Sequence, residues 1–451
     1  MRFPRGFARP KSWPPAALPL LVALAVAGCS RLAPSERSVT FIDTGPWVKH
    51  DFSEWRSAAL ERFTRETGIK VKLLPEPESP SQQLAMHLRL LRQHAVTPDV
   101  FAVDVIWPGM MAEHLLDLGP LVGGEAKDHF PAILANDTVG GRLVALPYRT
   151  DMGLLFYRAD LLRQYGFPSP PATWGELERM ARAILEKERA KGNMGLRGFV
   201  WAGVADESLT CTALEWQASE GGGSIVEADG TVSVNNARAA AALSRASGWI
   251  GALSPPGIAA YREWDAQSTW LSGDAIFMRD WPARYASSEA EDSAVRGKFD
   301  VAPLPGGAAG SAATLGGYGL AVSRYSRHQA EAVALVRFLC RKDIQLWRST
   351  ATSILPTIPS IYDDPQVLRA NPLMSRLKTA PIVGLVARPS TATGAKYGQV
   401  SSAYFTAVHR VLTGERTPQQ ALAEAEAGIV RITGFKPGPV PSPPSLRRSG
   451  R

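Results

Sequence analysis

The sequence predicts an α/β protein with more than one lobe. A chain of 451 residues is too long for one ordinary hydrophobic core, so we expect two or three compact lobes. From Val39 onward, candidate strands alternate with candidate helices, as is typical of α/β folds. Within Leu146–Tyr157 an apolar strand ends, polar and aromatic residues follow at Tyr148–Asp151, and a second apolar strand begins. This segment could link two lobes, although a loop inside one domain fits the same residues.

Composition and charge favour a globular body without net charge. The chain is 45% apolar and 20% charged, which is typical of a globular protein. The formal net charge is +8, but four of these positive charges lie in the first eleven residues and four in the last eighteen. Subtracting both groups leaves a neutral body, so the charge gives no reason to expect nucleic acid as a partner.

Residues 1–28 have the features of a targeting segment. A basic start leads into the apolar run Ala16–Ala27, which is too short to span a bilayer as a mature helix. The run closes on Val26–Cys29, which resembles the bacterial lipobox. This resemblance implies acylation of Cys29 and a tether over residues 29–37 on the extracytoplasmic side of a bacterial membrane. A plain signal peptide with a chance cysteine is the alternative.

The first part of the body predicts a strand–helix–strand succession. We expect strands at Val39–Ile42 and Ile69–Leu73, and a second helix around Gln82–Gln93. The first helix is indicated by apolar residues three and four positions apart, ending at Gly68. These residues are Phe52, Trp55, Ala59 and Phe63.

Asp104 ends the apolar run that starts at Pro98. Ligands of open parallel sheets gather at the carboxyl ends of the strands, so Asp104 lies where a binding carboxylate would be. A helix cap is the other role that fits Asp104.

Downstream motifs predict structure but no catalysis. Thr173 and Glu176 form a capping box for a helix that runs to about Ala190. The glycines at 221–223 and Asp229-Gly230 predict a turn and hairpin, because no Lys-Ser or Lys-Thr follows them to hold phosphates. The sequence also contains no His-Glu-x-x-His pair, no Gly-x-Ser-x-Gly elbow and no cysteine cluster with metal spacing.

Several stretches, taken in order, resemble one family. They are Pro98–Asp104, Ser208–Trp216, Gly273–Pro282, Thr314–Ser323 and Ala387–Ser390. With these stretches in this order, the chain from about Val39 to Thr433 resembles the extracellular solute-binding proteins of ABC importers, in the branch of the trehalose/maltose-binding proteins. Two residues depart from that pattern, because Asp280 replaces a common asparagine and Tyr318 a common tryptophan.

The resemblance implies a two-lobed periplasmic binding protein fold with discontinuous lobes and a three-segment hinge. We expect lobe 1 at 38–148 and 281–354, and lobe 2 at 152–278 and 357–432. The hinge segments would be Tyr148–Asp151, Arg279–Trp281 and Pro356–Pro359. Thr417, Pro418 and Gln420 begin a late helix, and residues 434–451 would form a disordered basic tail.

The resemblance also carries binding roles onto individual residues. Asp104 and Asp151 would accept hydrogen bonds from sugar hydroxyls, Arg388 would donate them, and Trp281 and Tyr318 would cover ring faces. Weaker candidates are Glu54, Tyr148, Arg149 and Gly317. Hinge packing beneath Pro282 is an alternative role for Trp281, and a surface ion pair is one for Arg388.

The expected function is capture of a di- or oligosaccharide of the trehalose or maltose type between two lobes, by a monomer without cofactor or metal. Because the sequence has no ATP site, a separate permease and ATPase are implied as partners. One alternative is a secreted glycoside hydrolase that uses Asp104 and Asp151. Another is a lipid-anchored sensor that signals to a receptor.

Cys211 and Cys340 could form a disulfide in an oxidising compartment. The lobe map places them in different lobes, where a bridge would oppose hinge closure. We therefore predict two free, buried thiols.

Overall fold

The computed structural model describes residues 37–43, 51–77, 80–379 and 384–440. The predicted targeting segment, Cys29 and the tether residues up to 36 lie outside these residues, as do 441–451. No helix in the described part of the chain combines the length and apolar character that crossing a membrane requires.

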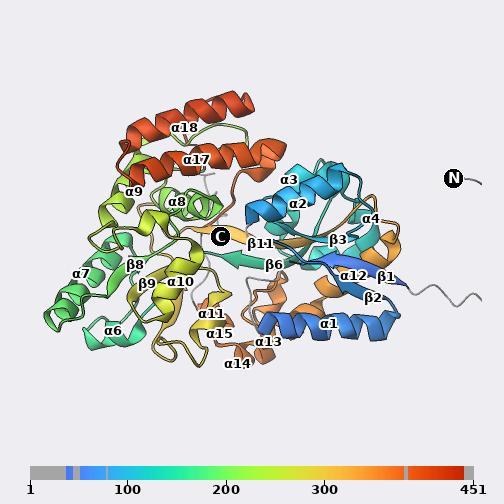
Figure 1. Ribbon diagram of the computed structural model, residues 1–451, viewed down its shortest axis with the longest axis horizontal. Coiled ribbons are helices and arrows are strands. Elements are labelled where there is room, and N and C mark those ends of the chain that lie inside the picture. The colour runs from blue at the N-terminus through green and yellow to red at the C-terminus, as the bar shows by residue number, and fades with distance from the viewer. Residues whose placement is uncertain (1–36, 44–50, 78–79, 380–383, 441–451) are drawn as a thin grey trace, which may run out of the picture. The chain divides into compact units, whose positions relative to one another are not determined.

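Two main sheets organise the fold (Figure 1). The first has the order β12-β11-β3-β1-β2. β6 also pairs with β11, on the edge that does not face β3. Neighbours of β1 run parallel to it, whereas β11 is antiparallel to both β3 and β6. Its strands are β1 (Ser38–Ile42), β2 (Lys70–Leu73), β3 (Val100–Asp104), β6 (Leu146–Met152), β11 (Ala313–Val322) and β12 (Leu385–Val386).

The second sheet has the order β10-β7-β9-β8. Only the pair of β8 and β9 is parallel. Its strands are β7 (Leu154–Tyr157), β8 (Arg197–Val200), β9 (Ala275–Asp280) and β10 (Asp300–Pro303). A separate two-stranded ribbon consists of β4 (Thr138–Val139) and β5 (Arg142–Leu143).

Helices cover both faces of the first sheet. Its strands alternate, so that Phe41 and Val100 join one core cluster while Ile42 and Phe101 join another. The helices of these parts are α1 (Asp51–Thr67), α2 (Pro80–Arg92), α3 (Pro108–Met111), α4 (Gly119–Val122), α5 (Pro131–Asn136), α12 (Gln329–Cys340) and α13 (Lys342–Ala351).

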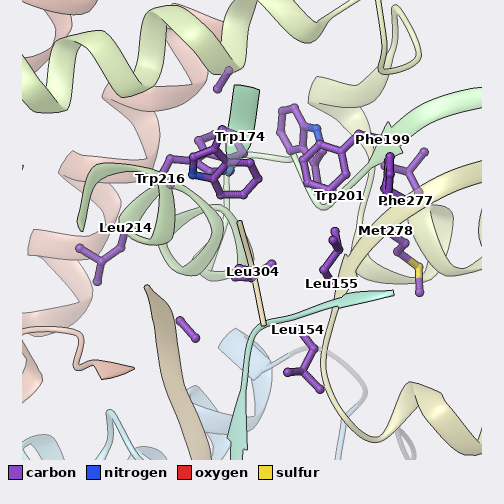
Figure 2. Close-up of a cluster of buried hydrophobic side chains, with 14 of the residues drawn as sticks. Leu154, Leu155, Trp174, Phe199, Trp201, Leu214, Trp216, Phe277, Met278 and Leu304 are labelled. Carbon is purple, nitrogen blue, oxygen red and sulfur yellow. The ribbon is translucent and has the colours of Figure 1, made fainter. Parts of the chain in front are cut away.

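The second sheet packs into the largest core cluster. At its centre lie indole and phenyl rings from α7, α8, α9 and β8, including Trp174, Phe199 and Trp216 (Figure 2). Trp216 and Trp249 meet edge to face with ring centroids 5.6 Å apart. The helices around this core are α6 (Ala159–Gln164), α7 (Trp174–Ala190), α8 (Glu207–Ser219), α9 (Ala237–Trp249), α10 (Glu263–Leu271), α11 (Arg284–Ser288), α14 (Pro365–Ala370), α15 (Pro372–Thr379), α16 (Ser390–Thr393), α17 (Tyr397–Leu412) and α18 (Pro418–Thr433).

Judged by the core in which its buried residues pack, the described chain passes between the two sheets at three places. β12 pairs with the start of β11, but Val386 packs against the core of the second sheet. β6 and β7 are separated only by Gly153, so the first crossing follows the predicted Tyr148–Asp151 segment, which itself belongs to β6. The third lies near Leu355, because Ile354 packs in a core of the first sheet and Ile358 in that of the second. The predicted hinge region at 356–359 follows directly after Leu355 in the chain.

The second crossing differs from the prediction. Arg279–Trp281 was expected to return the chain to lobe 1, but β10 pairs with β7 in the second sheet. Tyr285, Phe299 and Val301 also pack in the second core. The chain therefore returns to the first sheet only between Pro303 and Ala313. The apolar character of 299–304 predicts a buried strand but does not identify its partner.

The C-terminal segment also differs from the prediction. Residues 434–440 were expected to be disordered, but Val232 N donates to Lys436 O and Gly438 N donates to Val232 O. Val440 lies against Gly223, where an added Cβ would come within 2.8 Å of its methyl groups. Backbone pairing with the 226–232 turn therefore orders a stretch whose composition alone suggests disorder.

The predicted helix caps are present. Thr417 and Gln420 form the complete capping box at α18. At α7 the Thr173 side chain accepts from Glu176 N, but the Glu176 carboxylate accepts from Ala172 N rather than from the cap residue. Cys211 and Cys340 are both free and buried, as predicted.

Candidate functional site

Strand pairing in the first sheet brings several predicted site residues together. Tyr318 on β11 lies opposite Asp104 on β3 and opposite Arg149 on β6. Two positions away on the same pair of strands, Gly316 lies opposite Asp151. Asp104 is at the carboxyl end of β3, and its Oδ1 accepts from Ile106 N at 3.1 Å, so it also closes the turn after the strand.

Tyr318 presents a ring that is covered on one side by a cation. The Arg149 guanidinium carbon lies 4.1 Å from the Tyr318 ring centroid and 5.7 Å from that of Phe52 on α1. The Trp107 ring meets Tyr318 edge on, with 6.4 Å between centroids. Tyr318 remains half-buried, so these contacts fix the ring and leave part of it accessible.

Arg388 is held between two carboxylates. Its Nη1 lies 2.8 Å from Glu207 Oε1, and its Nη2 lies 3.5 Å from Asp104 Oδ1. Tyr397 and Ser401 on α17 donate to the same Glu207 carboxylate. Only 4% of the Arg388 side chain is exposed, so its role as an exposed surface ion pair is wrong. The guanidinium is instead a buried group that joins the end of β3 to α8.

The Asp151 carboxylate is buried, and its hydrogen-bonding capacity is only partly used. It is 8% exposed, and its Oδ1 is buried without a hydrogen-bond partner. Burial raises the pKa of the Asp151 carboxyl to about 6, against the opposing effect of the Arg149 guanidinium. Asp104 raises this pKa further, which indicates that the two acids sense each other's charge. An unpaired buried acceptor is costly unless a ligand or water donates to it.

Trp281 lies beside Asp151. Its Nε1 donates to Glu263 Oε1 at 2.7 Å, and the Arg279 guanidinium carbon lies 4.2 Å from its ring centroid. A Cβ added to Gly316 would come within 2.9 Å of Trp281 Cζ3 and 3.2 Å of Asp151 Cβ. A glycine is therefore needed there for the indole to approach the strand that faces Asp151.

The remaining predicted residues occupy different settings. Gly317 has φ +123°, and a Cβ there would lie 2.4 Å from Arg149 O, so its part is to let β6 and β11 approach at an irregular register. Tyr148 is fully buried, with the Arg348 guanidinium 4.7 Å from its ring centroid and donating to its carbonyl. Glu54 is exposed on α1.

Three acids near these residues were not singled out in the sequence. Glu207 contacts Arg388 from a helix 181 residues away in the chain, and Glu263 contacts Trp281 from a helix 18 residues before it. Asp43 directly follows β1, is 4% exposed and pairs with Arg56 at 3.3 Å. It could have been found by the argument used for Asp104, since both acids follow an apolar strand.

The arrangement suits polyol recognition better than metal binding. Among the described residues no group of three His, Cys, Asp or Glu side chains could hold a metal ion. Carboxylates, a guanidinium and two half-buried aromatic rings instead offer acceptors, donors and flat apolar faces.

Known proteins resemble the chain over most of its length. Residues 47–346 match the family model described as bacterial extracellular solute-binding protein. A Deinococcus radiodurans protein named "probable ABC transporter-binding protein" is 42% identical over 421 residues, which cover 93% of this chain and 98% of that protein.

Solved structures share the two-lobed fold. Maltose-bound MalE3 of T. maritima is 33% identical, with a TM-score of 0.79 over 88% of this chain and 99% of that one. The GacH receptor of Streptomyces glaucescens is 24% identical, with a TM-score of 0.74 over 89% and 99%. The latter likeness concerns the fold alone.

Proposed function

The chain belongs to the bacterial extracellular solute-binding proteins, and from this premise we propose that it captures a neutral di- or oligosaccharide of the trehalose or maltose type for an ABC importer. A permease and a cytoplasmic ATPase would then be its membrane partners. The bound maltose of the T. maritima relative supports the sugar class.

One observation carries the proposal most directly. The unpaired Oδ1 of Asp151 lies beside the strand position against which the Trp281 indole packs. A sugar matches this combination, because its hydroxyls donate hydrogen bonds while its C–H faces pack on aromatic rings. Asp104 and Arg388 add an acceptor and a donor within the same sheet end, and Tyr318 adds a second ring.

Closure of the two lobes would couple binding to transport. Asp104 and Tyr318 belong to the first sheet, whereas Trp281 follows β9 of the second. A ligand that touches both groups binds a closed form more tightly, and this difference shifts the population toward closure. We propose lobe boundaries at the three observed crossings, anchoring through Cys29 on the extracytoplasmic side, and action as a monomer.

Calorimetric titration with a panel of sugars tests the proposal. Asp151→Ala should weaken binding by about 1–3 kcal/mol, on the order of ten- to a hundredfold, because sugar hydroxyls lose a buried acceptor. Trp281→Ala should weaken it through lost stacking area. Asp229→Ala in an exposed turn is the matched control and should bind as the wild type does. Binding only to peptides, anions or metal ions would contradict the proposal.

An assay of glycoside hydrolysis and the identity of the neighbouring genes separate this function from its alternatives. A hydrolase would release chromophore from a chromogenic glycoside, whereas a binding protein leaves it intact. A sensor would bind sugar equally well but would be encoded beside a receptor instead of a permease and an ATPase.

A further inference from the structure

A buried ion pair lies directly behind the Trp281 indole. Glu215 on α8 and Arg279 on β9 are paired as a fork, with Arg279 Nε 2.8 Å from Oε2 and Nη2 2.5 Å from Oε1. Their side chains are only 1% and 3% exposed. A pair this deep adds little or no net stability, because removing both charges from water costs several kcal/mol per ion. Its position therefore suggests a role other than stability.

The Glu215 carboxylate contacts two of the three crossings. Its Oε1 accepts from Thr314 N at the start of β11, and a Cβ on Gly153 would lie 2.1 Å from the same oxygen. Thr314 Oγ1 also donates to Cys211 O at 2.9 Å, which joins β11 to α8 a second time. One carboxylate thus touches the chain where it leaves the first sheet and where it returns.

The Arg279 guanidinium contacts the indole. Its carbon lies 4.2 Å from the Trp281 ring centroid, and it is tied to Glu215 at the same time. Since Trp281 also packs toward Gly316 on β11, the side chains form a continuous series of contacts from the first crossing to the face beside Asp151. A planar guanidinium held by a fork has one orientation, so it can fix the ring that stacks on it.

We propose that Glu215 and Arg279 are positioning residues, which set the orientation of the Trp281 ring and couple it to the strands that cross between the sheets. This inference rests on the proposed function of Trp281 as a ligand-stacking residue. Sugar binding to Trp281 would thereby alter the packing at Gly153 and Thr314, where the chain passes between the lobes.

The test replaces the pair by apolar side chains in the full-length chain. Glu215→Leu with Arg279→Met removes both charges together, a change that is often neutral for stability. The control is Arg158→Met with Asp160→Leu. This removes a forked pair, 2.7 Å in both contacts, that follows the end of β7 opposite to the end beside Gly153. Fluorotryptophan labelling gives a 19F resonance for Trp281, assigned through Trp281→Phe.

We expect the double variant to have a lower thermal midpoint, because Thr314 N loses its buried acceptor, to shift the Trp281 resonance and to bind sugar about tenfold more weakly. The control pair should leave both the resonance and the affinity unchanged. An unshifted resonance with wild-type affinity would overturn the proposal.

A second variant tests the proposal even if the double variant does not fold. Arg279→Lys keeps the buried charge but loses the fork and the flat stacking surface, so it should also shift the resonance and weaken binding. Wild-type behaviour of Arg279→Lys would refute the positioning role. If the wild type binds no sugar, the proposed function fails, and the 19F measurement still decides whether the pair orients Trp281.

Discussion

At the scale of single residues, the charge environment of Asp151 determines what the site can do. Arg149 on the same strand, Arg284 on α11 and Arg348 on α13 all lower its pKa, and Asp104 on β3 raises it. Burial has the largest effect and leaves the pKa at about 6. The carboxyl therefore changes its charge between neutral and mildly acidic pH.

Sugar affinity should fall below about pH 6. The ionised carboxylate accepts hydroxyl hydrogen bonds, whereas the protonated form gives up part of that capacity, so affinity should drop about tenfold from pH 7 to pH 5. Titration calorimetry of Asp151→Asn supplies the comparison, because this variant should bind weakly without that pH dependence. Burial also raises the pKa of Asp280 to about 6, and its contribution is retained in the variant. An equal slope in both proteins would assign the titration to a group other than Asp151, such as Asp280 or Asp104, whose pKa burial also raises.

The same shift has the opposite sign for stability. Native Asp151 keeps its proton between about pH 4 and pH 6, where the unfolded chain has lost it. Its stabilising contribution is therefore complete below about pH 4 and disappears as the pH rises through 6. Denaturant titrations should show Asp151→Asn losing less stability than the wild type over this interval.

The sequence identifies site residues best where a local pattern marks them. Asp104 could be predicted because it ends an apolar run, and strand pairing then places Tyr318 opposite it. Glu207 and Glu263 could not, because nothing near them in the chain indicates Arg388 or Trp281 as partners. Both contacts depend on how a helix packs against the rest of the fold, which periodicity does not encode.

At the scale of elements, β11 is the strand whose local geometry matters most. It pairs with β3, β6 and β12, and its register shifts between Tyr318 and Gly319. Gly316 and Gly317 lie just before this irregularity. Together they admit the Trp281 indole and the Arg149 carbonyl to positions that a side chain would block.

Gly317→Ala should destabilise the protein by about 2–4 kcal/mol, because φ of +123° and a 2.4 Å approach to Arg149 O both exclude a Cβ. Gly175→Ala is the control, since it lies in the first turn of α7 with nothing within 4 Å and should be neutral or slightly stabilising. Equilibrium denaturation measures both variants. Equal stability of the two would mean that the bulge relaxes easily.

The starts of helices that carry a capping residue were predicted well. Thr173 and Thr417 cap α7 and α18 because their hydroxyls accept from backbone N–H groups three residues ahead. β10 was assigned to the wrong lobe, because an apolar strand carries no mark of its neighbour. The segment after Gly434 was missed because its order comes from pairing with Val232.

At the scale of the whole molecule, the predicted acyl anchor would hold the protein at the membrane. Cys29→Ser should move the protein from the membrane to the soluble fraction of a native host, because the mutant has no thiol at position 29 to acylate. Fractionation followed by immunoblotting measures this. Cys211→Ser is the matched control, since that thiol is buried in α8. Membrane association of Cys29→Ser equal to that of the wild type would refute the anchor.

The position of β11 in the first sheet, between β3 and β6, has a consequence for biosynthesis. β3 is made early, but its partner β11 comes only after the whole of the second sheet has been synthesised. The hydrogen bonds of β3 and β6 to β11 therefore close over a long sequence separation, which slows folding. While the ribosome is still translating the middle of the chain, the first sheet has no completed native form. Such delay would favour passage of an extracytoplasmic protein through a channel that accepts extended polypeptide and excludes a finished domain.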